Sequence, residues 1–246
     1  MKSPLAAALC LALTGPALAT EIGDMTNAER AAFRDEVRSY LLDNPDVLME
    51  AISVLESREQ QAQAQSDAEL IAENSEALFE DGQSWVGGDP EGDVTVVEFL
   101  DYRCGYCRRA FPEVSELIES DGNIRFIVKE FPILGEQSIL ASRFAIATQR
   151  IAGDDAYEAV HDDLMTLRGE VNQASLQGIA ADHGLDWDAI SAEMNVAAVD
   201  ARIEESLALG QSMGISGTPS FVFGDQMVRG YVPLDVMRKT VADERG

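Results

Sequence analysis

The 246-residue sequence predicts an α/β protein, in which a sheet domain carries an inserted helical block and follows a separate helical segment. Apolar strand patterns occupy residues 94–100 and 124–129, with a helical pattern between them. Residues 136–212 have helical patterns and no clear strand. Residues 26–80 have helical periodicity. Because two strands joined through a helix pair in parallel, we expect a βαβ unit at the centre of the sheet.

The first 19 residues have the pattern of an export signal. Lys2 gives a positive start, and residues 5–13 form an apolar run that is too short to span a bilayer. Small residues at Ala17 and Ala19 match the pattern of a cleavage site. We therefore expect residues 1–19 to be removed and the exported chain to begin near Thr20. A membrane anchor is the alternative interpretation.

Charge limits the class of partner. The chain has 44 acidic and 18 basic residues, which give a formal net charge of −26. A strongly acidic surface repels phosphate backbones and keeps a chain in solution. We therefore predict an acidic, solvated surface and no nucleic-acid partner.

Residues 20–81 are predicted to form a helical segment and spacer. Thr26 and Glu29 fit a capping box, and Asn44-Pro45 fits the start of a second helix. Each helix has an apolar stripe, formed by Phe33, Val37, Tyr40 and Leu41 and then by Val47, Leu48, Ala51, Ile52 and Leu55.

Neither stripe can be buried by these helices alone. The polar composition after Arg58 favours a spacer that keeps the stripes away from the main domain. We therefore expect a homo-oligomer that forms through residues 26–80. Docking of the stripes onto the same chain is the alternative.

The number of cysteines points to redox chemistry. Cys10 leaves with the signal, so the exported chain keeps Cys104 and Cys107, too few for a disulfide-stapled scaffold. A strand that leads into a helix at Cys104 places this sulfur at the helix N-terminus, which favours the thiolate. We expect Cys104 to be the nucleophile of a mixed disulfide and Cys107 to resolve it. The redox-active Cys104–Cys107 disulfide is then the redox group, and no other cofactor is expected.

A metal knuckle or a structural disulfide is the alternative for this pair. Zinc needs four ligands, and no further cysteine remains in the exported chain. His161 and His183 lie apart in the helical block and are interpreted as surface or capping residues. We therefore predict no metal site.

Charged residues flank the cysteine pair. Positive charge on Arg103, Arg108 and Arg109 would lower the pKa of the thiol, although they also fit ordinary surface positions. Glu98 occupies a core-facing position of the preceding strand, where burial would raise its pKa and allow it to accept a proton from Cys107. A structural Glu98–Lys129 pair is the alternative.

Thr218-Pro219 is a candidate substrate contact. It opens the first strand of a predicted hairpin, formed by residues 220–223 and 226–229. A proline here fits a cis peptide bond, and the backbone of Thr218 could pair with a substrate strand. A trans proline at a strand start is the alternative. Pro112 is expected to kink the helix that follows Cys104.

Three segments together resemble the DsbA family: residues 98–112, 129–135 and 214–221. The resemblance covers about residues 85–244. It implies a thioredoxin fold over residues 82–246, with a helical domain inserted at about 136–212, and a cis bond at Pro219. It also gives Glu98 the position of the family's buried acid. Gly105 and Tyr106, which lie between the cysteines, are then candidate substrate-contact residues beside Thr218 and Pro219.

The N-terminal segment resembles the ScsC branch, in which some members use such a segment to trimerise. The stretch Tyr-Leu-Leu-Asp-Asn-Pro-Asp-Val-Leu-Met-Glu (40–50) carries this resemblance. Cys-Gly-Tyr-Cys and Gly-Thr-Pro also match the disulfide isomerase DsbC. The dipeptide lacks Pro-His, and Thr218 stands where the DsbA pattern has valine; both departures disfavour a pure oxidase.

The resemblance implies a periplasmic thiol–disulfide oxidoreductase that acts on exported proteins as an isomerase or an oxidase. Such an enzyme needs a membrane redox partner, either an oxidant or a reductant. Because the ScsC branch is associated with copper tolerance, a copper-handling thiol protein of the cell envelope is the alternative function.

Overall fold

The computed structural model describes residues 25–246, so the expected signal at residues 1–19 and its cleavage site lie outside the described residues. The chain divides into two compact units between Glu59 and Gln60. The sequence placed this boundary later, between residues 81 and 82. Among the described helices, none has the length and apolar character that crossing a membrane requires.

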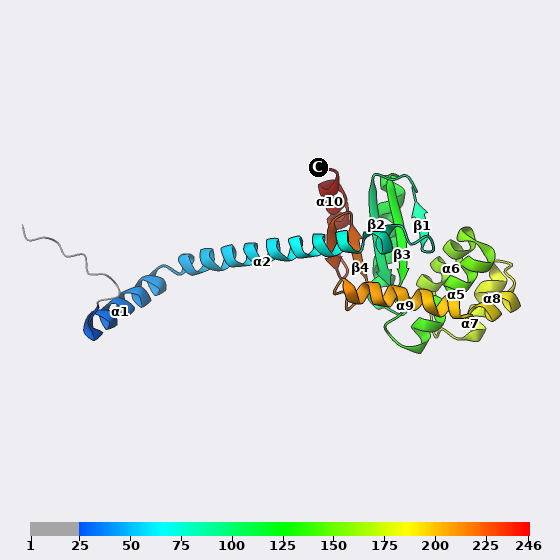
Figure 1. The fold of residues 1–246 in the computed structure, drawn as a ribbon, viewed down its shortest axis with the longest axis horizontal. Coiled ribbons are helices and arrows are strands. Elements are labelled where there is room, and N and C mark those ends of the chain that lie inside the picture. Colours follow the sequence, from blue (N-terminus) through cyan, green and yellow to red (C-terminus); the bar gives the residue numbers. More distant parts are fainter. Residues whose placement is uncertain (1–24) are drawn as a thin grey trace, which may run out of the picture. The chain divides into compact units, whose positions relative to one another are not determined.

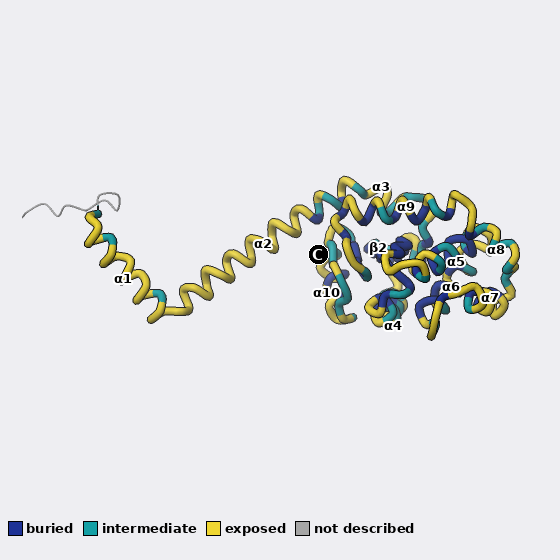
Figure 2. Tube along the Cα trace, turned by 90° about the horizontal axis from the view of Figure 1, so that it is seen from below, coloured by how far each residue is buried: buried dark blue, intermediate teal, exposed yellow. Residues whose placement is uncertain are grey.

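The first unit is helical. Helix α1 (Asn27–Asp43) begins with the predicted capping box, in which the N–H of Glu29 donates to Thr26 Oγ1 and the N–H of Thr26 donates to Glu29 Oε2. Asn44 ends this helix, and Pro45 begins α2 (Pro45–Glu73), as predicted. No residue of α1 is buried, and Figure 2 shows most of this helix exposed.

The second unit is built around a five-stranded sheet with the strand order β1-β3-β2-β4-β5. Its strands are β1 (Trp85–Gly88), β2 (Val94–Leu100), β3 (Ile124–Glu130), β4 (Ser220–Phe223) and β5 (Gln226–Arg229). Strands β2 and β3 are parallel and joined by α4 (Gly105–Asp121), which confirms the βαβ prediction. The other neighbours are antiparallel, and β4 and β5 form the predicted hairpin.

Strand β1 was not predicted by the sequence analysis. Two of its four residues are glycines, so it lacks the β-branched pattern of a strand. Gly87 is required because a Cβ there would lie 2.2 Å from Cη2 of the Trp85 ring. Pairing with β3, and not local propensity, therefore defines this strand.

Five helices lie between β3 and β4, where the helical insertion was predicted: α5 (Glu136–Ala152), α6 (Asp154–Thr166), α7 (Gln173–Asp182), α8 (Trp187–Glu193) and α9 (Ala197–Ser212). Helices α5 to α8 gather beside the sheet, and α9 returns to it (Figure 1). Helix α10 (Leu234–Arg245) closes the chain and packs against α4.

The two faces of the sheet have separate apolar cores. Val96 and Leu100 of β2 face the core that contains α4, α6 and α10. Val97 and Phe99 face the opposite core, which contains the end of α2, α3 (Ser75–Phe79) and α9. Ile71 and Leu78 are buried in this second core, so residues C-terminal to Gln60 pack with the sheet unit.

Candidate functional site

Cys104 is the N-cap residue of α4 and lies at the carboxyl end of β2. Its N–H donates to the carbonyl of Asp101, and its own carbonyl accepts from the N–H of Arg108. Its thiol donates to the carbonyl oxygen of Thr218, with the sulfur 3.1 Å from that oxygen. Cys107, one turn into the helix, is fully buried. Cys104 is therefore held between a helix N-terminus and the segment that precedes β4.

The first thiol is strongly acidic. A hydrogen bond from the Cys107 thiol is the largest cause that lowers the pKa of Cys104 to about 5, and the side chain of Thr218 and the N–H groups of Tyr106 and Cys107 add to it. Burial opposes this shift. The thiolate at a helix N-terminus is thus stabilised by donors that the fold places around it.

The pKa of the second thiol, that of Cys107, is shifted in the opposite direction. The neighbouring sulfur of Cys104, burial and the charge of Glu98 together raise the pKa of Cys107 above its ordinary value. The two sulfurs therefore differ in role: at neutral pH Cys104 is a thiolate, and Cys107 is a neutral thiol that donates to it.

Glu98 lies on the β2 face that carries α4, within the core. Its residue is 2% exposed, and its Oε1 atom has no hydrogen-bond partner among the described residues. Burial, and then the charge of Cys104, raise the pKa of Glu98 to about 8. The side chain lines a cavity of about 130 Å³, together with Ser115 and His161. Glu98 is therefore a buried acid whose charge acts on Cys107.

The Thr218–Pro219 peptide bond is cis, as the resemblance implied. The N–H of Gly230 donates to the carbonyl of Pro219 at 2.9 Å, which fixes this segment to the end of the hairpin. Gly105 and Tyr106 are exposed beside Cys104, with 61% of Tyr106 accessible. The residues predicted to contact substrate thus border the reactive sulfur.

With this geometry described, comparison with known proteins is informative. The DSBA-like thioredoxin domain family matches residues 95–242, which are more than half of the chain. The chain belongs to the DSBA-like thioredoxin domain family. Residues 29–62 match a second family, the copper resistance protein ScsC N-terminal domain. Both matches confirm the resemblances found in the sequence.

Solved structures agree with this DSBA-like assignment. A thioredoxin-like oxidoreductase from Silicibacter pomeroyi DSS-3 is 44% identical, with a TM-score of 0.65 over 69% of this chain and 96% of the other. ScsC from Proteus mirabilis, in a transitional conformation, is 26% identical, with a TM-score of 0.65 over 90% of this chain and 97% of the other. These comparisons confirm the prediction of a thiol–disulfide oxidoreductase at the level of the family.

Curated relatives include much longer proteins. The Na(+)/H(+) antiporter NhaA 1 of Salinispora arenicola is 31% identical over 157 residues, which are 63% of this chain. The chain spans about a quarter of the length of such relatives, 24% in this case. Disulfide bond formation protein D of Bacillus subtilis is 25% identical, over 66% of this chain and 77% of that protein.

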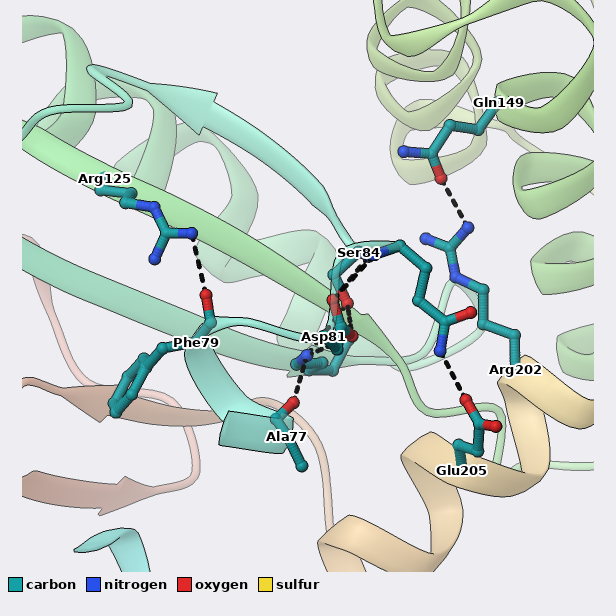
Figure 3. Close-up of polar contacts among 10 residues, drawn as sticks. Ala77, Phe79, Asp81, Ser84, Arg125, Gln149, Arg202 and Glu205 are labelled. Atoms are coloured by element: carbon teal, nitrogen blue, oxygen red, sulfur yellow. Dashed lines mark hydrogen bonds and ion pairs between the residues drawn. The ribbon is translucent and has the colours of Figure 1, made fainter. Parts of the chain in front are cut away.

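The alternative pairing of Glu98 with Lys129 is wrong. In the parallel register Glu98 is opposite Val128 and Phe99 is opposite Lys129, so the two charged side chains lie on opposite faces of the sheet. The Lys129 amine is buried and donates instead to the carbonyl of Ala77 and to Asp81 Oδ2, at 2.7 and 2.6 Å. Figure 3 labels the two accepting residues, Ala77 and Asp81. Lys129 therefore holds the segment after α3 against the sheet.

The three arginines beside the cysteines act through other contacts. Arg108 donates to the carbonyls of Tyr102 and Leu167, and Arg103 donates to the carbonyl of Gly169. Arg109 lies over the Tyr231 ring, 4.7 Å from its centroid. None of the three is among the causes that lower the pKa of Cys104. The contacts of these arginines are thus hydrogen bonds to carbonyl groups for Arg103 and Arg108 and a ring contact for Arg109.

The interpretation of His161 as a surface or capping residue is wrong. His161 is buried, its Nδ1 atom lies 3.1 Å from the Tyr102 hydroxyl, and its ring stacks on Tyr157. Burial lowers its pKa to about 4. His183 caps α7 and contacts Asp163, as expected for a capping residue. Residues 25–246 contain no cluster of three or more side chains that could hold a metal ion.

Sequence reasoning missed Asp101. This buried carboxylate accepts hydrogen bonds from the N–H groups of Arg103, Ile133 and Leu134. It therefore joins the segment before Cys104 to the loop after β3, where Ile133 and Leu134 are exposed. The sequence did contain a signal for Asp101: it is an acid that directly follows a predicted strand and lies three residues before Cys104.

Proposed function

We propose that the protein is a thiol–disulfide oxidoreductase that exchanges disulfides with exported proteins in the periplasm. The observation that carries this proposal is the pairing of an acidic Cys104 thiol, at the N-cap of α4, with a buried Cys107 thiol of raised pKa. A thiolate with a neighbouring neutral thiol is the arrangement that forms a mixed disulfide and then resolves it.

The reaction begins at the Cys104 sulfur, which belongs to a residue that is 7% exposed and lies beside the exposed Gly105 and Tyr106. In the reductive direction its thiolate attacks one sulfur of a substrate disulfide; an S–S bond forms, the substrate S–S bond breaks, and the other substrate sulfur leaves as a thiolate. Cys107 then loses its proton and attacks the Cys104 sulfur. The substrate is released as a dithiol, and the Cys104–Cys107 disulfide remains. The reverse sequence oxidises a substrate dithiol.

Glu98 is proposed as the group that takes the proton from Cys107. Its buried carboxylate has a pKa of about 8, near the working pH, and its charge is among the causes that raise the pKa of Cys107. A general base whose pKa lies near the operating pH transfers a proton efficiently in both directions.

The substrate is proposed to lie along the Thr218–Pro219 segment, beside Gly105 and Tyr106. An extended chain there can pair with the backbone of Thr218, whose carbonyl oxygen lies 3.1 Å from the Cys104 sulfur. A membrane protein is then required to return the enzyme to its oxidised or reduced form. The neutral dipeptide between the cysteines and the threonine before Pro219 favour isomerase activity over pure oxidation.

Self-association is proposed to arise from the first unit. Its apolar residues, none of them buried, line a groove of about 440 Å³, formed by Phe33, Val37, Leu41, Leu42 and Leu48 with Arg34 and Arg38. An apolar surface of this kind in water favours burial against a second copy. Two active sites in one oligomer can hold a misfolded substrate and favour isomerisation.

The proposed activity is tested with scrambled ribonuclease in a glutathione buffer. We expect recovery of ribonuclease activity with the full exported chain and none with Cys104→Ser. The Cys107→Ser variant should accumulate mixed disulfides with substrate, because the resolving thiol is absent. Unchanged activity in Cys104→Ser would refute the proposal. Val37→Asp, with Ser39→Asp as a control on the same helix, tests whether isomerisation requires the oligomer.

Copper handling is the second candidate, favoured by the match of residues 29–62 to a copper resistance protein domain. Two thiols suit Cu(I), and in the absence of a third clustered ligand among the described residues the ion would be two-coordinate or shared between subunits. Titration of Cu(I) into the reduced protein tests this function: binding that Cys104→Ser abolishes supports it, and absence of tight binding removes it.

A further inference from the structure

We propose that Arg103 and Arg109 form a cationic rim around Cys104, which selects polypeptide segments that carry acidic residues next to their disulfide. This inference rests on the proposed thiol–disulfide exchange and names the substrate class of the same site. It runs against the net charge of −26, which by itself predicts a preference for basic clients.

The two arginines flank the Cys104–Cys107 pair in the chain. Arg103 directly precedes Cys104 in the chain. Arg109 follows Tyr106 by three residues on α4, so the side chains of Tyr106 and Arg109 lie on the same exposed face of this helix. Arg109 also lies over the ring of Tyr231, which follows Gly230, the donor to the Pro219 carbonyl. Arg109 is thus beside the cis-proline segment.

Both guanidinium groups are held without being neutralised. Arg103 Nη1 donates to the carbonyl of Gly169 at 2.8 Å, and Arg109 contacts the Tyr231 ring. Within residues 25–246 neither forms an ion pair with a carboxylate. Elsewhere in the second unit arginines commonly pair with acids, namely Arg143, Arg150, Arg229, Arg238 and Arg245.

Two acids border the rim and reduce its charge in part. Both oxygens of Glu113 accept hydrogen bonds, from the Tyr231 hydroxyl and from the N–H of Leu234. Glu170 follows Gly169 in the chain, and Arg168 precedes this glycine. The two rim arginines nevertheless keep N–H donors that no carboxylate of the described residues occupies through an ion pair. At about 0.15 M salt the Debye length is about 8 Å, so these nearby charges outweigh the distant acidic surface.

Arginine suits these two positions for a structural reason. A neutral hydrogen bond and a ring contact fix the direction of each guanidinium while leaving N–H donors free for a carboxylate. Arg108, between them in sequence, differs because its donors are used by the carbonyls of Tyr102, Leu164 and Leu167. It is therefore not part of the rim.

The test uses three peptides that differ only in the residues next to one cysteine, which are aspartate, asparagine or lysine. Each cysteine carries a thiopyridyl group, and attack of the Cys104 thiolate on the peptide sulfur releases neutral thiopyridone. Each rate is divided by the rate with 2-mercaptoethanol, which removes the intrinsic effect of the flanking charge on the disulfide. The full exported chain is used in reduced form at about 0.15 M salt.

We expect the aspartate peptide to react fastest and the lysine peptide slowest, with a ratio of roughly threefold or more between aspartate and asparagine. Arg103→Gln/Arg109→Gln should lose this order while keeping the rate with the asparagine peptide. Arg103→Lys/Arg109→Lys should keep the order. Arg238→Gln/Lys239→Gln, which removes two exposed charges from α10, should also keep it.

Several outcomes overturn the rim. The proposal is overturned if the lysine peptide reacts fastest with the wild-type protein. It is also overturned if the order of the three rates survives in Arg103→Gln/Arg109→Gln. Equal loss of rate with all three peptides in that variant would mean that the arginines support the Cys104 thiolate instead. A wild-type protein that reacts with none of the peptides refutes the proposed function itself, so the two failures are distinguishable.

Discussion

The Oδ2 atom of Asp101 accepts a hydrogen bond from the backbone N–H of Ile133 at 2.8 Å, and so ties the approach to Cys104 to the loop after β3. The same atom accepts from the N–H of Leu134 at 3.0 Å, and Oδ1 accepts from the N–H of Arg103 at 2.7 Å. Three backbone donors thus depend on one buried carboxylate.

Asp101→Asn should therefore destabilise the protein. An amide group places two donors where the carboxylate offered acceptors, so at least one buried N–H loses its partner. We expect a loss of about 2 kcal/mol in the free energy of unfolding, measured with urea. The control is Asp182→Asn, at an exposed position of α7, which should change it by less than about 0.5 kcal/mol. Equal stability of the two variants would contradict the assigned role of Asp101.

Alkylation by iodoacetamide should report the acidic thiol of Cys104. The reaction rate of the reduced protein should rise with pH around a midpoint near 5, because the thiolate is the reacting form. In Cys107→Ala the midpoint should move upward, since the hydrogen bond from Cys107 is the largest cause of the low pKa. A wild-type midpoint near 9.0, the ordinary value, would rule out this account of the site.

The low pKa of Cys104 also has a consequence for stability. Its pKa is about 5 in the folded protein and 9.0 when unperturbed, so ionisation stabilises the folded reduced form. This contribution is fully present above pH 9 and is lost as pH falls through 5. The melting temperature of the reduced protein should therefore fall relative to that of the oxidised protein as pH is lowered across this window.

Parts of the fold follow directly from the sequence. The boundaries of β2 and of the hairpin strands β4 and β5 could be predicted, because an apolar run and the turn residues Gly224-Asp225 are local signals in the sequence. The placement of Cys104 at the start of α4 follows from the same local order of strand and helix. The two thiols and the cis-proline segment could thus be located before their contacts were known.

Other features depend on contacts that no local pattern contains. The partner of Lys129 could not be identified because the relative register of β2 and β3, and hence the face on which each side chain lies, is set by their pairing. The burial of His161 depends on stacking with Trp85 and Tyr157, which come from β1 and α6. Strand β1 itself exists through its pairing with β3.

Glu98→Gln should change how stability depends on pH. The pKa of Glu98 is raised to about 8 from 4.5, so the folded protein retains a proton that the unfolded chain releases. Stability is therefore lost as pH rises from about 4.5 towards 8, by at most about 4–5 kcal/mol at 1.36 kcal/mol per pKa unit. The neutral glutamine removes this loss.

The measurement is the free energy of unfolding of oxidised wild-type and Glu98→Gln proteins at several pH values. Using the disulfide form removes the charge of the Cys104 thiolate and isolates the effect of burial. The difference between the two proteins should grow in favour of Glu98→Gln from pH 5 to pH 8. A difference that stays constant over this range would show that Glu98 does not titrate there.

A double-mutant cycle should distinguish the two candidate partners of Lys129. Its amine is buried and lies 2.6 Å from Asp81, whereas Glu98 lies on the other face of the sheet. We expect Lys129→Met to cost about 2–3 kcal/mol, because the Asp81 carboxylate and the Ala77 carbonyl lose their donor. Lys129→Met with Asp81→Asn should be non-additive by about 1 kcal/mol or more, and Lys129→Met with Glu98→Gln should be additive within about 0.5 kcal/mol. Coupling of Lys129 to Glu98 and not to Asp81 would mean that the register of β2 against β3 is incorrect.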